Sequence, residues 1–244
     1  HQADYNRAWP GTDLDEGSET RLMRQVYDIM KARSPFASID VHNNTGQNPH
    51  YACVNYLDHQ LLQLASLFSP IIVYFQRPLG VQSRAFASIC PAITVECGKP
   101  HLSSSQQHAE EFLQACLNLK EISDKPLNKE VGLYHTVATV NVPDSCTISF
   151  DDAPHDICFV PDLDHLNFCH LEPGTLIAKT NTPHHIPLNV IDIEGNDVSS
   201  NYFDFSHQEI RTCNDVIPSM LTLNEKVIRQ DCLCYLMERL TYEV

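Results

Sequence analysis

The chain has 244 residues, with 31 Asp or Glu against 16 Lys or Arg, so its formal net charge is −15 with neutral histidines. This excess of acid, with no cluster of Lys and Arg, argues against partners such as nucleic acid or an anionic membrane surface. Hydrophobic residues make up 43% of the chain, enough to bury a full core, which argues against disorder. The longest apolar stretches, such as Ile71–Phe75, are too short to span a bilayer.

The first half of the chain alternates between helical and strand patterns. Residues 20–33 place apolar side chains on one face at helical spacing, and Phe36–Val41 is a short apolar segment that predicts a buried strand. The same reasoning predicts helices over residues 53–68 and 103–119 and strands at Ile71–Phe75 and Ala92–Val95. Residues 1–120 are therefore expected to form an α/β layer with helices on both faces of a sheet.

The sequence pattern changes after a polar connection at Lys120–Glu130. Short β-rich runs follow, separated by Pro, Gly, Asn and Asp, and they predict a smaller β-rich domain over residues 131–244. The predicted strands are Leu133–Val142, Cys146–Phe150, Ile157–Val160, Thr175–Lys179 and Ile186–Ile193. The ten cysteines contain no Cys-x-x-Cys pair, and a reducing cytoplasm is the simplest compartment for them.

A histidine and an aspartate stand together at the end of the first predicted strand. Asp40 and His42 are two residues apart, so on a strand their side chains point to the same face. A carboxylate beside an imidazole fixes its tautomer and orientation, as it does for histidines that bind metals. His42 is therefore a candidate metal ligand, and a hydrogen-bonded structural histidine is the alternative.

A glutamate ends another predicted strand. Ile93, Thr94 and Val95 lead to Glu96, followed by Cys97-Gly98, so the carboxylate is expected at the carboxyl edge of the sheet, where open α/β sheets place their ligands. Glu96 is a candidate general base, and a solvated loop carboxylate is the alternative.

An asparagine and an arginine precede the first helix. A guanidinium matches a carboxylate with two parallel hydrogen bonds, and an adjacent amide adds another, so Asn6-Arg7 suits a substrate carboxylate. The alternative is a surface arginine stacked beside Trp9. Because the whole chain is acidic, any carboxylate site must be locally positive, and Arg7, Arg77, Arg84 and Lys99 are the candidates.

Together, in this order, these segments resemble the zinc-carboxypeptidase superfamily and, within it, the succinylglutamate desuccinylase/aspartoacylase family. The resemblance rests on Asn6-Arg7, Asp40-Val41-His42-Asn43-Asn44-Thr45 and Val95-Glu96-Cys97-Gly98. It implies a zinc-carboxypeptidase-like mixed sheet with helices on both faces, followed by a smaller β-rich domain. It also implies a Zn²⁺ cofactor and a small N-acyl amino acid as substrate.

The resemblance assigns a role to each motif residue. His42 would be the third zinc ligand, supported by Asp40, and Glu96 would act as general base and then as general acid. Asn6 and Arg7 would hold the substrate carboxylate. The implied reaction is hydrolysis of the amide bond by a metal-activated water, and the sequence leaves the acyl group and the oligomeric state open.

One part of the family pattern is missing. The first two zinc ligands would come from a His-x-x-Glu upstream of His42, and none precedes it. The match at His108–Glu111 lies on a predicted helix, where an exposed face is the interpretation. We expect that an amino-terminal segment of the full protein is absent from this sequence. The alternative is a protein that starts here and cannot hold zinc in the family's manner.

Two rival functions use the same residues. A zinc carboxypeptidase acting on peptides would share Arg7, His42 and Glu96. A metal-free, degenerate relative would bind small carboxylates through Asn6 and Arg7 without cleaving them. The hydrolase hypothesis requires Arg7, His42 and Glu96 to face one pocket.

Overall fold

The computed structural model describes residues 4–151, 155–181 and 188–241 and contains two β-sheets. The larger sheet has strand order β1-β4-β2-β3-β5-β13-β12, with β9 paired to β5, and the smaller one has the order β10-β11-β8-β7-β6. The strands of the larger sheet are β1 Ser38–His42, β2 Tyr51–Val54, β3 Ile71–Tyr74, β4 Ala92–Glu96, β5 Gly132–Asn141, β9 Asn189–Asp192, β12 Ile217–Ser219 and β13 Cys234–Arg239. Those of the smaller sheet are β6 Ile148–Ser149, β7 Ile157–Phe159, β8 Leu176–Thr180, β10 Phe203–Ser206 and β11 Glu209–Thr212.

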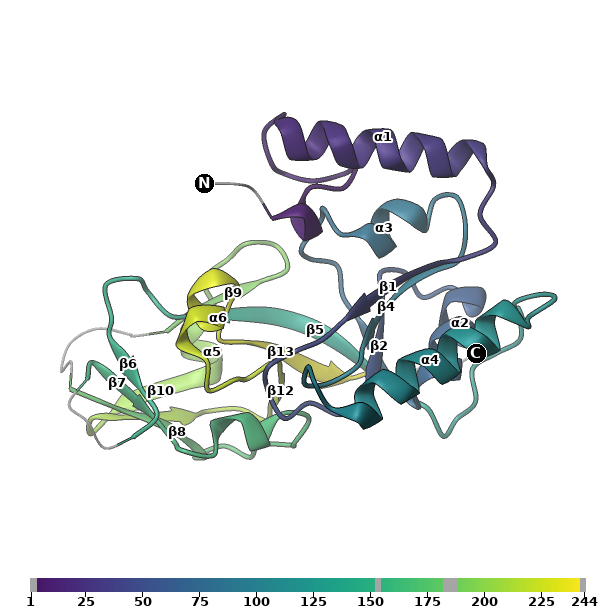
Figure 1. Ribbon diagram of the computed structural model, residues 1–244. Helices are drawn as coiled ribbons and strands as arrows, with labels where there is room; N and C mark the ends of the chain where they lie inside the picture. Colours follow the sequence, from purple (N-terminus) through teal and green to yellow (C-terminus); the bar gives the residue numbers. More distant parts are fainter. Residues whose placement is uncertain (1–3, 152–154, 182–187, 242–244) are drawn as a thin grey trace.

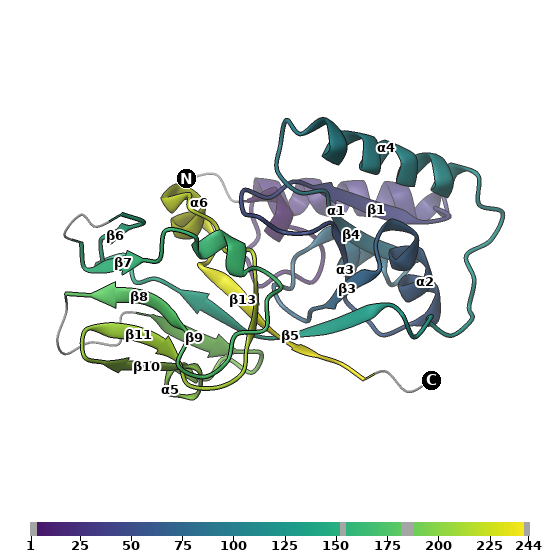
Figure 2. The same cartoon turned by 90° about the horizontal axis from the view of Figure 1, so that it is seen from below.

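Helices lie on both faces of the larger sheet, and the smaller sheet lies at one end of the molecule (Figure 1). Helix α1 lies above α3 on one side, whereas α2 and α4 lie on the other, as Figure 2 shows from below. The α-helices are α1 Ser18–Ala32, α2 His59–Phe68, α3 Gln82–Phe86, α4 Ser103–Leu117, α5 Ser199–Tyr202 and α6 Glu225–Gln230, and the 3-10 turns are η1 Tyr5–Arg7 and η2 Leu163–Leu166. No helix within the described ranges is long and apolar enough to cross a membrane.

Alternation along the strands separates an apolar face from a polar one. Ile93 and Val95 of β4 point into a core that includes Ala52 and Val54 of β2 and the buried side chains of α2. Thr94 and Glu96, which alternate with them along β4, therefore point to the opposite face. This period of two decides which side of the sheet carries the chemistry.

The smaller sheet packs against the far end of the larger one. A second core joins Ala138 and Val140 of β5 and Val190 of β9 to Ile157 of β7 and Ile210 of β11, all at most 2% exposed. Burying these side chains holds the two sheets together, because each buried valine or isoleucine side chain contributes about 1.5–3 kcal/mol.

The predicted elements of the first half hold with one correction and one addition. Residues 53–68 are not one helix: β2 runs to Val54, and α2 begins only after Asp58, whose side chain accepts hydrogen bonds from the amides of Gln60 and Leu61. By periodicity alone, the short apolar run before Asp58 fits either a helix or a buried strand. It forms a strand because it pairs with the neighbouring strands. Helix α3 was not predicted.

The predicted strands of the second half appear as β5 to β9. Strands β6 and β7 are shorter than predicted and β5 and β8 are shifted by one residue, whereas the predicted Ile186–Ile193 begins outside the described residues. Strand β5 pairs with β3 in parallel and β13 pairs with β5, so the larger sheet takes strands from both sides of the Lys120–Glu130 connection. The division into units 1–120 and 131–244 stays a prediction, and the sheet is continuous across it.

Candidate active site

A cavity of about 330 Å³ lies over the polar face of the larger sheet. Strands β1 and β4 run parallel with His42 opposite Glu96, while β2 runs antiparallel to β4 with Tyr51 opposite Glu96. Alternate residues of these strands therefore line the cavity floor, among them Asp40, His42, Tyr51, Thr94 and Glu96. The site therefore covers part of the polar face of the sheet as well as its carboxyl edge. The sequence predicted only the position at the edge.

The three segments singled out in the sequence meet in this cavity. Asn6, Arg7, Asp40, His42 and Glu96 all line it, although they come from a 3-10 turn and two strands. The structure thus brings together every sequence-predicted site residue. Their chemical roles stay predictions.

His42 is oriented by Asp40. The His42 Nε2 lies 3.0 Å from Asp40 Oδ2, and its Nδ1 lies 3.9 Å from Glu96 Oε1. The hydrogen bond to Asp40 raises the pKa of His42 above its usual value of 6.5, against the opposing effect of burial. One ring nitrogen is thus occupied by a carboxylate, and the other faces Glu96.

Glu96 is a buried carboxyl group, with 6% of the residue exposed. Burial raises the pKa of Glu96 from 4.5 to about 7, although the nearby His42 and a hydrogen bond from Asn44 act in the opposite direction. A carboxyl group with a pKa near 7 exchanges protons readily at neutral pH, as general acids and bases do.

Two asparagines of the loop after β1 hold Glu96 in place. The Asn44 Nδ2 donates to Glu96 Oε2 over 3.2 Å, and the Asn48 Nδ2 donates to Asn44 Oδ1 over 3.2 Å. The Met220 amide donates to Asn48 Oδ1, so this chain of hydrogen bonds reaches from β4 to the segment after β12. Asn44 stood within the motif, but its contact with Glu96 was not predicted.

Arg7 sits in the cavity wall through close packing of η1 on the loop at Gly80. The Trp9 amide donates to the Gly80 carbonyl over 3.1 Å, and a Cβ on Gly80 would lie 2.0 Å from the Arg7 carbonyl oxygen. Trp9 packs edge to face on Phe86 with ring centroids 5.5 Å apart, and it is buried. The alternative, a surface arginine stacked beside Trp9, is wrong for Trp9, which packs into a core with side chains of α1 and α3.

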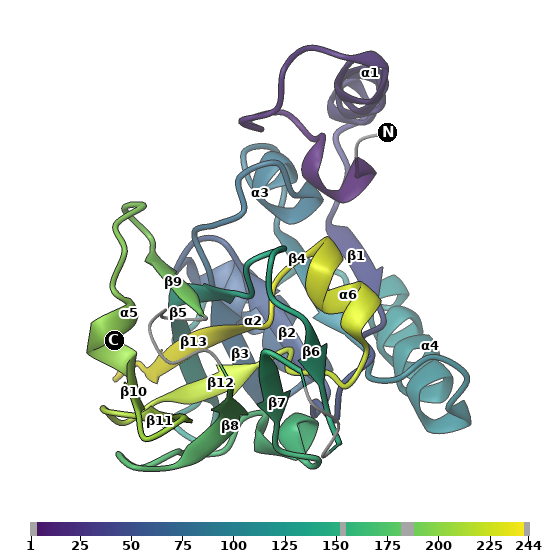
Figure 3. The same cartoon turned by 90° about the vertical axis from the view of Figure 1, so that its left-hand side faces the viewer.

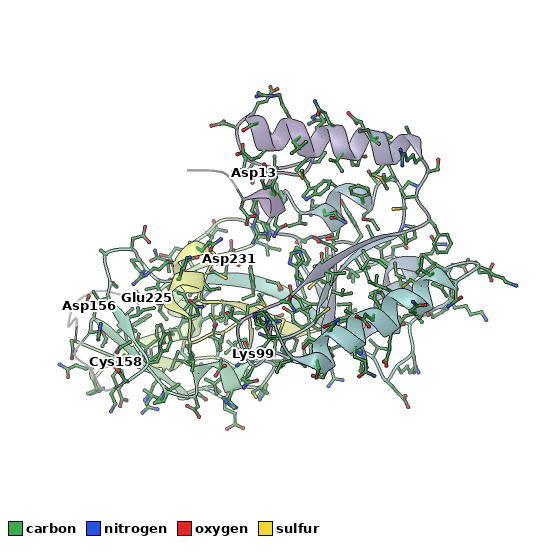
Figure 4. All side chains as sticks on the ribbon, viewed as in Figure 1. Asp13, Lys99, Asp156, Cys158, Glu225 and Asp231 are labelled. Carbon is green, nitrogen blue, oxygen red and sulfur yellow. The ribbon has the colours of Figure 1, made fainter. Side chains whose placement is uncertain are left out.

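Arg7 has an ionic partner that sequence analysis missed. The Arg7 Nη2 lies 2.9 Å from Asp231 Oδ1, just after α6. Figure 3 shows α6 in yellow below η1, and Figure 4 labels Asp231 between these two elements. Asp231 is 224 residues from Arg7, so no local pattern could have indicated the pair.

The remaining basic candidates have separate places. Arg77 lines the cavity and pairs with Asp13, while Lys99 pairs with Asp164. Arg84 donates to the Gln76 carbonyl and is absent from the cavity lining. Only Arg7 and Arg77 among the four candidates therefore reach the cavity.

Catalytic zinc usually has three protein ligands and an open position. Within the described ranges, no group of three or more His, Cys, Asp and Glu side chains has the arrangement to hold a metal ion. His42 offers one ring nitrogen, Nδ1, beside the Glu96 carboxylate. The described residues therefore supply one plausible ligand and do not fit a complete zinc site.

His108, the first residue of the His-x-x-Glu match, has a structural role. It is half-buried on α4, where its Nε2 lies 2.8 Å from the Phe68 carbonyl oxygen and its ring stacks on His50 at 4.4 Å between centroids. The exposed face predicted for this segment is correct for Glu111 and wrong for His108.

No family model matches this sequence, and no curated protein sequence matches it. Several solved structures, in contrast, match the fold of this chain. The succinylglutamate desuccinylase from Chromobacterium violaceum matches with a TM-score of 0.61 and 14% identity, over 100% of this chain and 69% of that chain. Murine aminoacylase 3 matches with a TM-score of 0.57 and 15% identity, over 98% of this chain and 77% of that one.

A third similar structure is a succinylglutamate desuccinylase/aspartoacylase from Rhodobacter sphaeroides, with a TM-score of 0.55 and 14% identity over 98% of this chain and 68% of that one. At such low identity these likenesses establish the fold. The expected mixed sheet with helices on both faces, followed by a smaller sheet, is confirmed as the architecture of these deacylase structures.

Proposed function

We propose that this chain belongs to the succinylglutamate desuccinylase/aspartoacylase family and hydrolyses the amide bond of a small N-acyl amino acid. The observation that carries the proposal is Glu96, a buried carboxyl group with a pKa raised to about 7 that faces His42 in the cavity. Perturbed carboxyl groups in a cavity are typical of acid–base catalysis. The fold shared with deacylase structures supports the same reaction class.

In this proposal Glu96 moves the protons. Its carboxylate takes a proton from a water molecule as that water attacks the amide carbonyl, and the same carboxyl group returns the proton to the leaving amine. The hydrogen bond from Asn44 holds the Oε2 atom and leaves Oε1 on the side of His42. Arg7 and Asn6, which line the same cavity, hold the carboxylate of the amino acid.

Zinc is the finer part of the proposal. We propose His42 as one ligand, held by Asp40, and no catalytic step above depends on the metal because the described residues do not complete a site. The other ligands would have to come from outside the described residues.

The size of the cavity supports a small substrate. About 330 Å³ is near the lower end of ordinary ligand pockets, which suits an acylated amino acid better than a peptide. In this proposal the substrate contacts both Arg7 and Glu96, which line the same cavity.

The direct test measures release of free amine from a panel of N-acyl amino acids by the full-length protein and its Glu96→Gln variant. We expect turnover by the wild type and a loss of at least ~10² in the variant, with an unchanged fold by circular dichroism. Glu121→Gln, at an exposed position, is the control and should keep full activity. Near-normal turnover by Glu96→Gln would remove Glu96 from the mechanism.

The same panel separates the rivals. Faster cleavage of short peptides than of acyl amino acids would indicate the carboxypeptidase. Binding of acyl amino acids that survives chelation and Glu96→Gln, without any turnover, would indicate the carboxylate-binding relative.

A further inference from the structure

The cavity has more acid than base. Its charged lining consists of the carboxyl groups of Asp4, Asp40, Glu96 and Asp231 against the guanidinium groups of Arg7 and Arg77, with His42 between Asp40 and Glu96. A Zn²⁺ at His42, as proposed above, would balance these four carboxyl groups and two guanidinium groups, so the cavity has no surplus positive charge for a second carboxylate on a ligand. An additional negative charge on that ligand is repelled at short range.

Both guanidinium groups already have a carboxylate partner. The Arg7 Nη2 lies 2.9 Å from Asp231 Oδ1, and the Arg77 Nη1 lies 3.1 Å from Asp13 Oδ2. The Arg77 Nε also donates to the Ile193 carbonyl over 3.3 Å. The positive charge available for an anionic ligand is therefore largely cancelled before the ligand arrives.

Arg7 keeps enough donors for one carboxylate. A guanidinium has five N–H groups, and the contacts of Arg7 use Nη2 toward Asp231 and Nη1 toward the Asn6 carbonyl. Asn6 stands beside it at the cavity wall. One carboxylate can thus be bound by hydrogen bonds, while a second one finds only Arg77, which is held by Asp13 and is half-exposed.

The rest of the wall is uncharged: beside apolar and aromatic side chains it contains the polar residues Asn43, Thr94, Thr136, Ser219 and Gln230. Tyr51, Val73 and Met220 belong to one apolar cluster, and Phe75 and Val81 also line the cavity. Such a wall stabilises an uncharged side chain or an alkyl part of an acyl group by burying its apolar surface.

We propose that the substrate is an N-acyl amino acid with a single carboxylate and an uncharged side chain, and that Asp231 is the residue that excludes a second carboxylate. The inference rests on the proposed function. Asp231 acts by cancelling the charge of Arg7 and by repelling an additional anionic group, without touching the reacting bond.

The test compares N-acetylglutamine with N-acetylglutamate, which have nearly the same shape and differ by one charge. The full-length wild type should have a kcat/KM at least about tenfold higher for N-acetylglutamine. Asp231→Asn should shift this ratio toward N-acetylglutamate by about tenfold, and the shift should shrink at high salt. A residue with only a structural role would change both substrates alike.

Asp215→Asn is the matched control, since it removes the same charge at an exposed site outside the cavity lining. The ratio should stay at its wild-type value in this variant. The inference is overturned if the wild type prefers N-acetylglutamate or treats the two equally, or if both Asn variants move the ratio by the same amount.

A binding measurement separates this inference from the proposed function. Calorimetry with the Glu96→Gln variant gives the two dissociation constants without turnover. Tighter binding of N-acetylglutamine supports the inference even if the wild type cleaves neither ligand, a result that would instead refute the proposed hydrolase. Equal binding of the two ligands, or binding of neither, refutes the inference.

Discussion

The His42 Nε2 lies 3.0 Å from Asp40 Oδ2, so the second residue upstream on the same strand fixes the imidazole and leaves Nδ1 toward Glu96. Both side chains project from one face of β1 because they are two residues apart. This contact links a short sequence pattern directly to the electrostatics of the cavity.

Asp40→Asn should lower the pKa of His42, because the hydrogen bond that the imidazole donates to Asp40 is the largest cause of its raised value. An NMR titration of the imidazole in chelator-treated protein measures the change. Asp28→Asn, at an exposed position on α1, should leave the titration of His42 where it is. An unchanged His42 pKa in Asp40→Asn would show that the contact does not govern the imidazole.

Glu96→Gln should weaken the dependence of the free energy of unfolding on pH. The folded pKa of Glu96, about 7, lies above its ordinary value of 4.5. The contribution of this carboxyl group to the free energy of unfolding is therefore fully present below about pH 4.5. It is lost as the pH rises through about 7. The neutral variant lacks this loss, so at pH 8 it should gain up to about 3 kcal/mol relative to wild type.

Urea denaturation of chelator-treated protein between pH 5 and pH 8.5 checks this expectation. Glu130→Gln, at an exposed position, should run parallel to the wild type over the whole range. If the free energy of unfolding of Glu96→Gln changed with pH as it does in the wild type, Glu96 would not have the raised pKa that its burial predicts.

Asn44→Ala should move the acidic limb of the kcat/KM profile to higher pH. The hydrogen bond from Asn44 lowers the pKa of Glu96, so its loss raises that pKa further. Leaving Glu96 Oε2 without this donor should also cost about 1–3 kcal/mol of stability. Asn43→Ala removes an amide that donates to the Gly98 carbonyl instead, and it should not move the limb.

Gly80→Ala should disturb Arg7 without touching the cavity directly. The added methyl group would lie 2.0 Å from the Arg7 carbonyl oxygen, so η1 must move. We expect a destabilisation of about 1–3 kcal/mol and a fall in kcat/KM of about tenfold or more. Gly17→Ala, where the nearest heavy atom to the new Cβ is 3.5 Å away, is the control. Equal effects of the two substitutions would contradict the role of the close approach at Gly80.

Zinc binding through His42 predicts a specific loss of metal. Elemental analysis of the full-length protein should find zinc, and His42→Ala should reduce the zinc content at least about tenfold, since loss of one ligand weakens a three-ligand site severely. His165→Ala, at an exposed position, should keep its zinc. Equal zinc contents in the two variants would exclude His42 as a ligand.

Local pattern predicted the strand ends well, because burial and chain direction act over a few residues. Asp40 and His42 share the polar face because they stand two positions apart on β1, and Glu96 shares it with Thr94, two positions before it on β4. The strand β2 was mistaken for the start of a helix, because a four-residue apolar run carries no distinct period and only its pairing with β3 and β4 decides it.

The sequence by itself determined the acidic character of the chain, the alternation that sends Glu96 and His42 to one side of their strands, and the resemblance that joined three distant motifs. Only the tertiary structure decided the partner of Arg7, the support of Glu96 by Asn44 and the continuity of the larger sheet across residues 120–131. The reason is physical: side-chain direction follows from neighbours in the chain, whereas Asp231 reaches Arg7 only because β13 pairs with β5 and brings the end of α6 over the cavity. The excess of carboxylates around the site likewise exists only in the folded chain.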